Sequence, residues 1–75
     1  MSLKDIQERV AWGEEFYFIY DNEKYWISQN KYGFYLTRVK DSKTQPFQTA
    51  KELFEYGKID GKTLCEIWND IKSYF

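Results

Sequence analysis

The stretch from residue 16 to residue 39 constrains the fold most, because three strand-like segments alternate there with turn-like ones. The first segment, Phe16 to Tyr20 (FYFIY), contains only aromatic and β-branched residues, which pack well on a pleated sheet. Tyr25 to Ser28 and Phe34 to Val39 have the same character. Residues 21–24 and 30–33 are polar or contain glycine, as turns do. We therefore predict a three-stranded antiparallel meander.

A helix is expected on the N-terminal side of this meander. Leu3, Ile6 and Val10 recur at helical spacing, with charged residues between them. Ser2 is a suitable N-cap, and Gly13 is a residue that ends helices. The pattern predicts a short helix over about residues 3 to 11.

Two helices are expected after the meander, which is followed by a polar loop over Lys40 to Thr44. Thr49 and Glu52 form a capping-box pattern that begins a helix over about residues 50 to 56, and Gly57 ends it. Asp60 is expected to cap the last helix. The apolar stripe of that helix consists of Leu64, Ile67, Trp68, Ile71 and Tyr74. The chain is thus predicted to be one α+β domain over residues 1–75, with both C-terminal helices packed on one sheet face.

Turn positions assign the strand residues to two faces, because side chains alternate along a strand. We centre the first turn on Asn22 and Glu23, which places Ile19 opposite Trp26, and we take residues 30–33 as the second turn. The core face then holds the apolar set Phe16, Phe18, Tyr20, Tyr25, Ile27, Phe34 and Leu36. The other face holds Tyr17, Ile19, Trp26, Ser28, Tyr35 and Thr37, with Val39 at its margin.

The second face is unusually aromatic, since a sheet covered on one side normally presents polar residues on the other. Its candidate interface residues are Tyr17, Ile19, Trp26 and Tyr35. One explanation is that the first helix, with Trp12 after it, folds back over them and makes a second small core. The other is a binding surface for a partner protein or a second copy of the chain, because Tyr and Trp contribute large contact area with little rotamer entropy. A one-residue slip in the second hairpin would move Tyr35 to the core face.

Catalysis has few candidate residues in this chain. There is no His and a single cysteine, Cys65, so an internal disulfide, a metal site and an activated nucleophile are all disfavoured. The carboxylate pairs Glu14–Glu15 and Glu52–Glu55 are expected to be solvated. We therefore predict a protein that is not an enzyme and that binds no cofactor and no metal.

The same counts bear on where the protein works. The lone Cys65, expected as a half-buried structural thiol on the last helix, fits a reducing compartment, so we predict a cytoplasmic protein. The longest run of apolar and aromatic residues, Phe16 to Tyr20, is far shorter than the about 20 residues of a membrane span, so no membrane partner is expected.

An alternative function is binding of single-stranded nucleic acid, whose bases stack on aromatic sheet residues. The cations that could contact phosphates are Lys24, Lys31, Arg38, Lys40 and Lys43. The same residues can serve as charges that protect strand edges. The net charge of −1 offers little to phosphates, so nucleic acid is the less favoured partner.

Three stretches of the chain carry a resemblance to a known group of proteins. They are Gly13 to Ile27 (GEEFYFIYDNEKYWI), Gly33 to Thr37 (GFYLT) and Lys51 to Ile71, in which Ile59 to Trp68 is the most specific part. The chain resembles short uncharacterised proteins of Gram-positive bacteria such as Clostridia and of their phages. Those proteins tend to have polar residues where this chain has Tyr17, Ile19 and Trp26. The resemblance therefore implies no function, and an interface at those positions would be particular to this chain.

Overall fold

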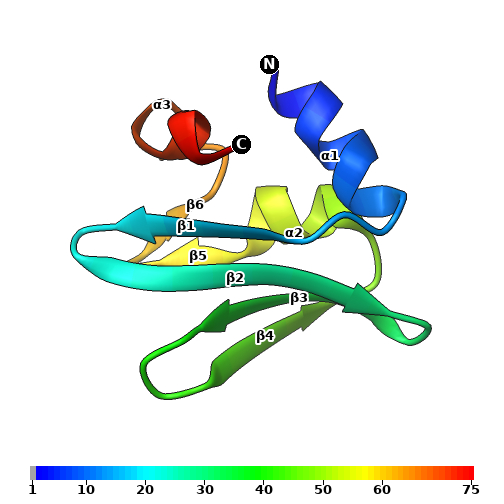
Figure 1. Cartoon of the computed structure of the whole chain (residues 1–75), viewed down its shortest axis with the longest axis horizontal. Coiled ribbons are helices and arrows are strands. Elements are labelled where there is room, and N and C mark those ends of the chain that lie inside the picture. Colours follow the sequence, from blue (N-terminus) through cyan, green and yellow to red (C-terminus); the bar gives the residue numbers. More distant parts are fainter. Residues whose placement is uncertain (1) are drawn as a thin grey trace.

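The computed structural model describes residues 2–75 and confirms the α+β class (Figure 1). A four-stranded antiparallel sheet has the strand order β1-β2-β3-β4, so β1 and β4 are its edges, and β5 and β6 form a separate two-stranded hairpin. In chain order the elements are α1 (Leu3–Ala11), β1 (Phe16–Tyr20), β2 (Glu23–Asn30), β3 (Gly33–Arg38), β4 (Lys43–Phe47), α2 (Ala50–Tyr56), β5 (Lys58–Ile59), β6 (Lys62–Thr63), α3 (Trp68–Ile71) and the 3₁₀ turn η1 (Lys72–Tyr74).

Helix α1 begins and ends where the sequence predicts. The Ser2 hydroxyl accepts a hydrogen bond from the Asp5 amide at 3.2 Å, and the Asp5 carboxylate accepts one from the Ser2 amide at 3.3 Å. This reciprocal pair satisfies two of the amides that a helix start leaves without partners. After Trp12, Gly13 adopts a φ of 108°, which ends the helix and turns the chain toward β1.

The first hairpin turns one residue earlier than predicted. Asp21 and Asn22 form the turn with φ values of 52° and 65°, the left-handed pair that joins two strands most tightly. Tyr17 therefore pairs with Trp26, whereas the prediction that Ile19 lies opposite Trp26 is wrong. Moving the turn by one residue moves each cross-strand partner by two, so every side chain keeps its predicted face.

The second hairpin has the predicted register. Ile27 pairs with Leu36, and Ser28 pairs with Tyr35. The register thus keeps Tyr35 on the same face as Trp26.

A fourth strand, β4, begins within the polar loop expected over Lys40 to Thr44 and continues to Phe47, where no strand was predicted. Its sequence Lys-Thr-Gln-Pro-Phe has little strand propensity, but it pairs with β3 from Arg38–Lys43 to Phe34–Phe47. Pro46 is tolerated because β4 is an edge strand, where an amide is not needed on the outer side. The prediction of three strands is wrong for this reason.

Helix α2 confirms its predicted bounds. Thr49 accepts a hydrogen bond from the Glu52 amide at 3.0 Å, and Gly57 follows the last helical residue. A Cβ at Gly57 would lie 2.4 Å from the carbonyl oxygen of Leu53, so only glycine fits the close approach that ends this helix.

The predicted long last helix is wrong. Asp60 and Gly61 have φ values of 52° and 79° and make the turn between β5 and β6, so Asp60 caps no helix. The local cap is Thr63 instead, whose hydroxyl accepts from the Glu66 amide while its own amide donates to the Glu66 carboxylate. Only four residues, Trp68–Ile71, are α-helical after it.

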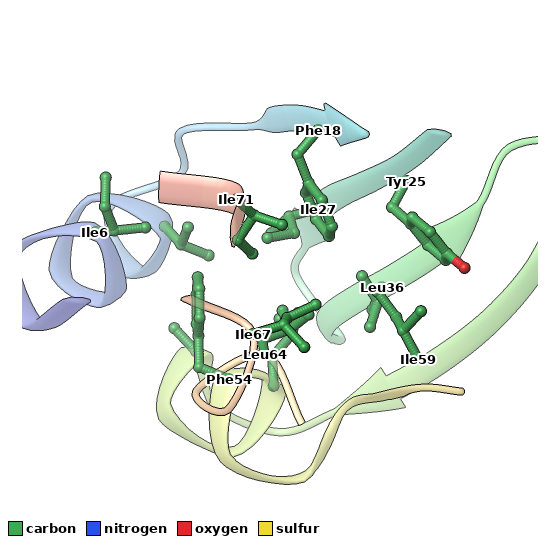
Figure 2. Close-up of a cluster of buried hydrophobic side chains, with 13 residues drawn as sticks. Ile6, Phe18, Tyr25, Ile27, Leu36, Phe54, Ile59, Leu64, Ile67 and Ile71 are labelled. Carbon is green, nitrogen blue, oxygen red and sulfur yellow. The ribbon is translucent and has the colours of Figure 1, made fainter. Parts of the chain in front are cut away.

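One core holds the three helices and the β5–β6 hairpin against the inner face of the sheet (Figure 2). Ile71 of α3 lies in this core with Phe18 and Ile27 of the sheet, as the apolar stripe predicts, whereas within the described residues the ring contacts of Trp68 are with Phe54 and Phe75 and not with the sheet. Trp68 is half-buried against Phe54 and Phe75, with ring centroids 6.5 Å and 5.2 Å away. The other fully buried side chains of the cluster are Ile6, Val10, Leu53, Leu64 and Ile67.

Helix α1 belongs to this core and does not cover the other face of the sheet. Ile6 and Val10 are fully buried in the same cluster as Phe18, and α1 packs against α2. The explanation in which the first helix makes a second core is therefore wrong. The physical reason is that α1 has a single apolar face. The inner core already buries this face, so no apolar face of the helix is left to pack on the outer side of the sheet.

Candidate functional site

The outer face of the sheet is the surface that α1 leaves open. We define it by the side chains that the strand register and the contacts below place there: Glu15, Tyr17, Ile19, Lys24, Trp26, Ser28, Tyr35, Thr37, Val39 and Thr44. Tyr17 is 51% exposed and Ile19 is 46% exposed, while Trp26 and Tyr35 are half-buried. All four candidate interface residues therefore lie on one face.

A stacked pair of rings occupies the middle of the outer face. Tyr17 and Trp26 are cross-strand partners, and their rings are nearly parallel at 5°, with centroids 5.7 Å apart. The Lys24 ammonium lies 4.5 Å from the Tyr17 ring centroid, in cation–π contact on the adjacent strand. The Trp26 indole Nε1 donates to the Glu15 carboxylate at 3.2 Å. These contacts fix both rings before any partner arrives.

Tyr35 extends the outer face toward β3. It is the diagonal neighbour of Trp26, because Trp26 pairs with Thr37 and Tyr35 is two residues away on β3. The Tyr35 hydroxyl donates to Asn30 Oδ1 at 3.1 Å, which ties it to the β2–β3 turn. Beyond β3, Thr37 and Thr44 join hydroxyls at 3.0 Å, so the face becomes polar toward β4. The aromatic part is thus confined to β1, β2 and the start of β3, with Val39 and Pro46 as apolar residues at its margins.

The sequence analysis did not predict that Glu15 and Lys24 contact the rings of the outer face. Glu15 was grouped with Glu14 as a solvated pair, and Lys24 was grouped with the other cations. The structure separates the two carboxylates: Glu14 receives two hydrogen bonds from the Arg9 guanidinium, which lower the pKa of that carboxyl. Alternation along β1 and β2 was the available signal, since it places Glu15 and Lys24 on the same face as Tyr17.

The five cations do not gather on the aromatic face. Only Lys24 lies there, while Lys31 is in the turn at the opposite end of the sheet from the β3–β4 turn. Arg38 and Lys43 are cross-strand partners on the other side of the sheet, in register with Tyr25. Arg38 is also held by Asp41 through hydrogen bonds of 3.0 and 2.7 Å. A nucleic-acid backbone crossing the rings would therefore meet one ammonium.

Cys65 is half-buried in the turn before α3, not on a helix as predicted. Burial raises the pKa of its thiol, and the Glu55 and Glu66 carboxylates raise it further. The thiol is therefore held in its protonated, weakly nucleophilic form at neutral pH.

Residues 2–75 contain no group of three or more His, Cys, Asp and Glu side chains arranged to hold a metal ion. None of the helices over the same residues is long and apolar enough to cross a membrane.

Comparison with protein-family models, with curated proteins and with solved structures gives no significant match. The resemblance drawn from the sequence stays a prediction.

Proposed function

We propose that this chain is a small non-enzymatic protein-interaction module that binds through the outer face, with a second copy of the chain as its simplest partner. The observation that carries the proposal is the exposed pair Tyr17 and Ile19 beside the stacked Trp26. Apolar surface gathered in one patch is typical of interaction sites. The rings are already fixed by their neighbours, so binding would order few side chains.

The charges of the outer face support a second copy as partner. The face carries one anion, Glu15, and one cation, Lys24, at the two ends of the β1–β2 hairpin. If two outer faces meet about a two-fold axis perpendicular to the strands, the strands of the second copy run in the opposite direction. Lys24 of each copy would then face Glu15 of the other. Most homo-oligomers use one patch twice in this way, and complementary charges fix the orientation.

Binding of single-stranded nucleic acid is supported less well. Stacking rings are present, but the Tyr17 and Trp26 faces are stacked on each other, and Glu15 lies against the indole edge. Affinity for nucleic acid comes largely from contacts to phosphates, which need several cations along the path. Four of the five candidate cations lie away from the outer face, and Lys40 is one of them because it is paired with Glu23, the cross-strand partner of Tyr20 on the inner side.

The test is light scattering over a concentration series with matched variants. Wild type should show a mass that rises with concentration, and Trp26→Glu should stay monomeric. Ile19→Glu should do the same while keeping the fold, because the new carboxylate lies opposite Lys24. Trp12→Glu is the control, since Trp12 is 78% exposed and lies outside the outer face.

Three outcomes would contradict the proposal. Wild type that remains monomeric into the high micromolar range would remove the second copy as partner. Equal loss of association in Trp12→Glu and Trp26→Glu would place the contact elsewhere. Co-purification with nucleic acid, detected by its absorbance and lost in Trp26→Glu, would favour the alternative function.

A further inference from the structure

A pocket of about 250 Å³ opens on the inner side of the sheet, away from the outer face. It lies where the β5–β6 hairpin faces the ends of β3 and β4, and Leu36 and Ile59 form its apolar floor. Pockets for drug-sized ligands usually measure about 300–1,000 Å³. This pocket therefore suits a smaller molecule, such as a single ring with one polar group.

Two cations stand directly opposite each other on the pocket wall. Arg38 of β3 and Lys43 of β4 are cross-strand partners, and both line the pocket. Like charges in this position destabilise a sheet. Asp41 offsets part of the repulsion by binding Arg38 with two hydrogen bonds, which also hold the guanidinium in one orientation. Arg has five N–H groups, so the two hydrogen bonds to Asp41 leave other donors on this pocket-lining residue, and one of these contacts the neighbouring Tyr25 side chain.

The third polar group is the hydroxyl of Tyr25. Only 6% of this residue is exposed, and it lines the pocket. Figure 2 shows its ring beside Leu36, with the hydroxyl at the end directed away from Phe18 and Ile27. Burial raises the pKa of this phenol, so the hydroxyl keeps its proton and remains a hydrogen-bond donor at neutral pH.

The wall formed by β5 is held rigidly. The Gln45 side-chain amide donates to the Lys58 carbonyl at 2.7 Å and accepts from the Lys58 amide at 2.9 Å, so it pairs with β5 as a strand would. This contact fixes Ile59 over the floor and keeps Lys58 at the rim. Asp60 is the one acidic residue in the lining, against three cations.

We propose that this pocket binds a small molecule that carries an oxyanion, a phosphate monoester or carboxylate, on a flat apolar ring. The oxyanion would lie between Arg38 and Lys43 and accept a hydrogen bond from Tyr25, and the ring would cover Leu36 and Ile59. Charge-assisted hydrogen bonds from a guanidinium are the strong contacts in such a site. The inference goes beyond the proposed function and is independent of it, because the pocket and the outer face are on opposite sides of the sheet.

The experiment is a titration of amide chemical shifts with phenyl phosphate, inorganic phosphate, benzoate and uncharged benzyl alcohol. Phenyl phosphate and benzoate should give saturable shifts at Arg38, Lys43 and residues 58–60, in the millimolar range or tighter. Inorganic phosphate should bind more weakly, because it lacks the ring, and benzyl alcohol should give no saturable shift. Light scattering of the same samples separates this result from self-association.

Variants locate the site. Arg38→Gln should weaken phenyl phosphate binding about tenfold or more, as expected for loss of a hydrogen bond to a charged group. Lys43→Gln and Tyr25→Phe should weaken it less, and Tyr25→Phe keeps the buried ring. Lys72→Gln, the same charge change at an exposed residue outside the pocket, should leave binding unchanged.

Two results would overturn the inference. The first is the absence of saturable shifts in the pocket residues with both ring-bearing anions. The second is an equal loss of binding in Lys72→Gln and Lys43→Gln, which would indicate a general effect of net charge. Equal binding of inorganic phosphate and phenyl phosphate would overturn the role given to Leu36 and Ile59.

Discussion

The aromatic ring of Tyr17 lies parallel to the indole of Trp26 across the β1–β2 ladder, 5.7 Å between centroids. This pair exists because the hairpin turns at Asp21 and Asn22, one residue earlier than the strand pattern suggests. The side chain opposite Trp26 is therefore a ring and not the aliphatic Ile19. The stack gives the outer face its rigid centre.

Tyr17 and Trp26 should be energetically coupled. Aromatic pairs contribute about 0.5–1.5 kcal/mol beyond the area that they bury. In a double-mutant cycle with Tyr17→Leu and Trp26→Leu, measured by urea unfolding, we expect a coupling near the lower end of that range because the pair is partly exposed. The matched cycle of Ile19→Leu with Trp26→Leu should show almost no coupling. Coupling energies that are equal in the two cycles would argue against the observed register.

The turn between β1 and β2 should tolerate glycine and reject a β-branched residue. Asn22 has a φ of 65°, a conformation that costs a residue with a branched side chain about 1–2 kcal/mol. Asn22→Val should therefore lower the free energy of unfolding by about that amount, and Asn22→Gly should leave it unchanged or raise it. Thermal unfolding of the two variants measures the difference. Equal stability of both would indicate a longer turn.

Trp68 should be essential for stability although the helix around it is short. Its ring packs on Phe54 and Phe75, and Phe75 in turn lies 5.0 Å from Phe16 and 5.8 Å from Phe18. Trp68→Ala should lower the free energy of unfolding by about 3 kcal/mol, the lower end for such truncations, because Trp68 is half-buried. Tyr74→Ala is the control, since Tyr74 is 45% exposed. A Trp68→Ala protein with the same melting temperature as wild type would contradict this arrangement of the C-terminal segment.

Cys65 should be replaceable and slow to react. Cys65→Ala removes one half-buried sulfur, so the free energy of unfolding should fall by no more than about 1 kcal/mol. Because the pKa of the thiol is raised, modification by a thiol reagent should be slower than for a free cysteine peptide and should accelerate as the pH rises. A native rate equal to that of the peptide at neutral pH would show that the thiol is neither buried nor shifted.

Asp41 should titrate far below an ordinary aspartate. Its hydrogen bonds from Arg38 lower its pKa from 3.8 to about 2 in the folded protein. A folded-state pKa below the unfolded one adds stability that is present above pH 3.8 and is lost as the pH falls toward 2. In Asp41→Asn, the free energy of unfolding should therefore fall less steeply as the pH is lowered from 3.8 toward 2. Asp70→Asn, which lies outside this ion pair, is the control and should keep the wild-type pH dependence. Carboxyl NMR shifts give the midpoint directly, and a midpoint near 3.8 would contradict the pairing.

The faces of the first three strands could be predicted because alternation is a local property of the chain. Even the misplaced first turn kept Tyr17, Ile19 and Trp26 together, since an error of one residue in the turn displaces partners by an even number. The candidate site was accessible to sequence reasoning for that reason. Whether the first helix covers that face could not be predicted, because the burial of Ile6 and Val10 in the inner core depends on contacts between residues far apart in the sequence.

Two segments could not be predicted for a different physical reason. The residues of β4 become a strand through pairing with β3 and through the contact of Gln45 with β5, neither of which shows in the local pattern. The stripe from Leu64 to Tyr74 has helical spacing, yet residues 64–67 form turns and only Trp68–Ile71 are α-helical. Tertiary contacts overrode propensity in β4.

The two edges of the sheet differ in a way that limits how large an assembly can grow. The β4 edge carries Pro46, which has no amide, and Lys43, both features that discourage addition of another strand. The β1 edge is the uncharged run Phe16–Tyr20, with neither device. Strand addition is therefore open at one edge of each molecule. If two copies joined through β1, the union would use up both open edges, and the joined sheet would have no open edge left for a further strand.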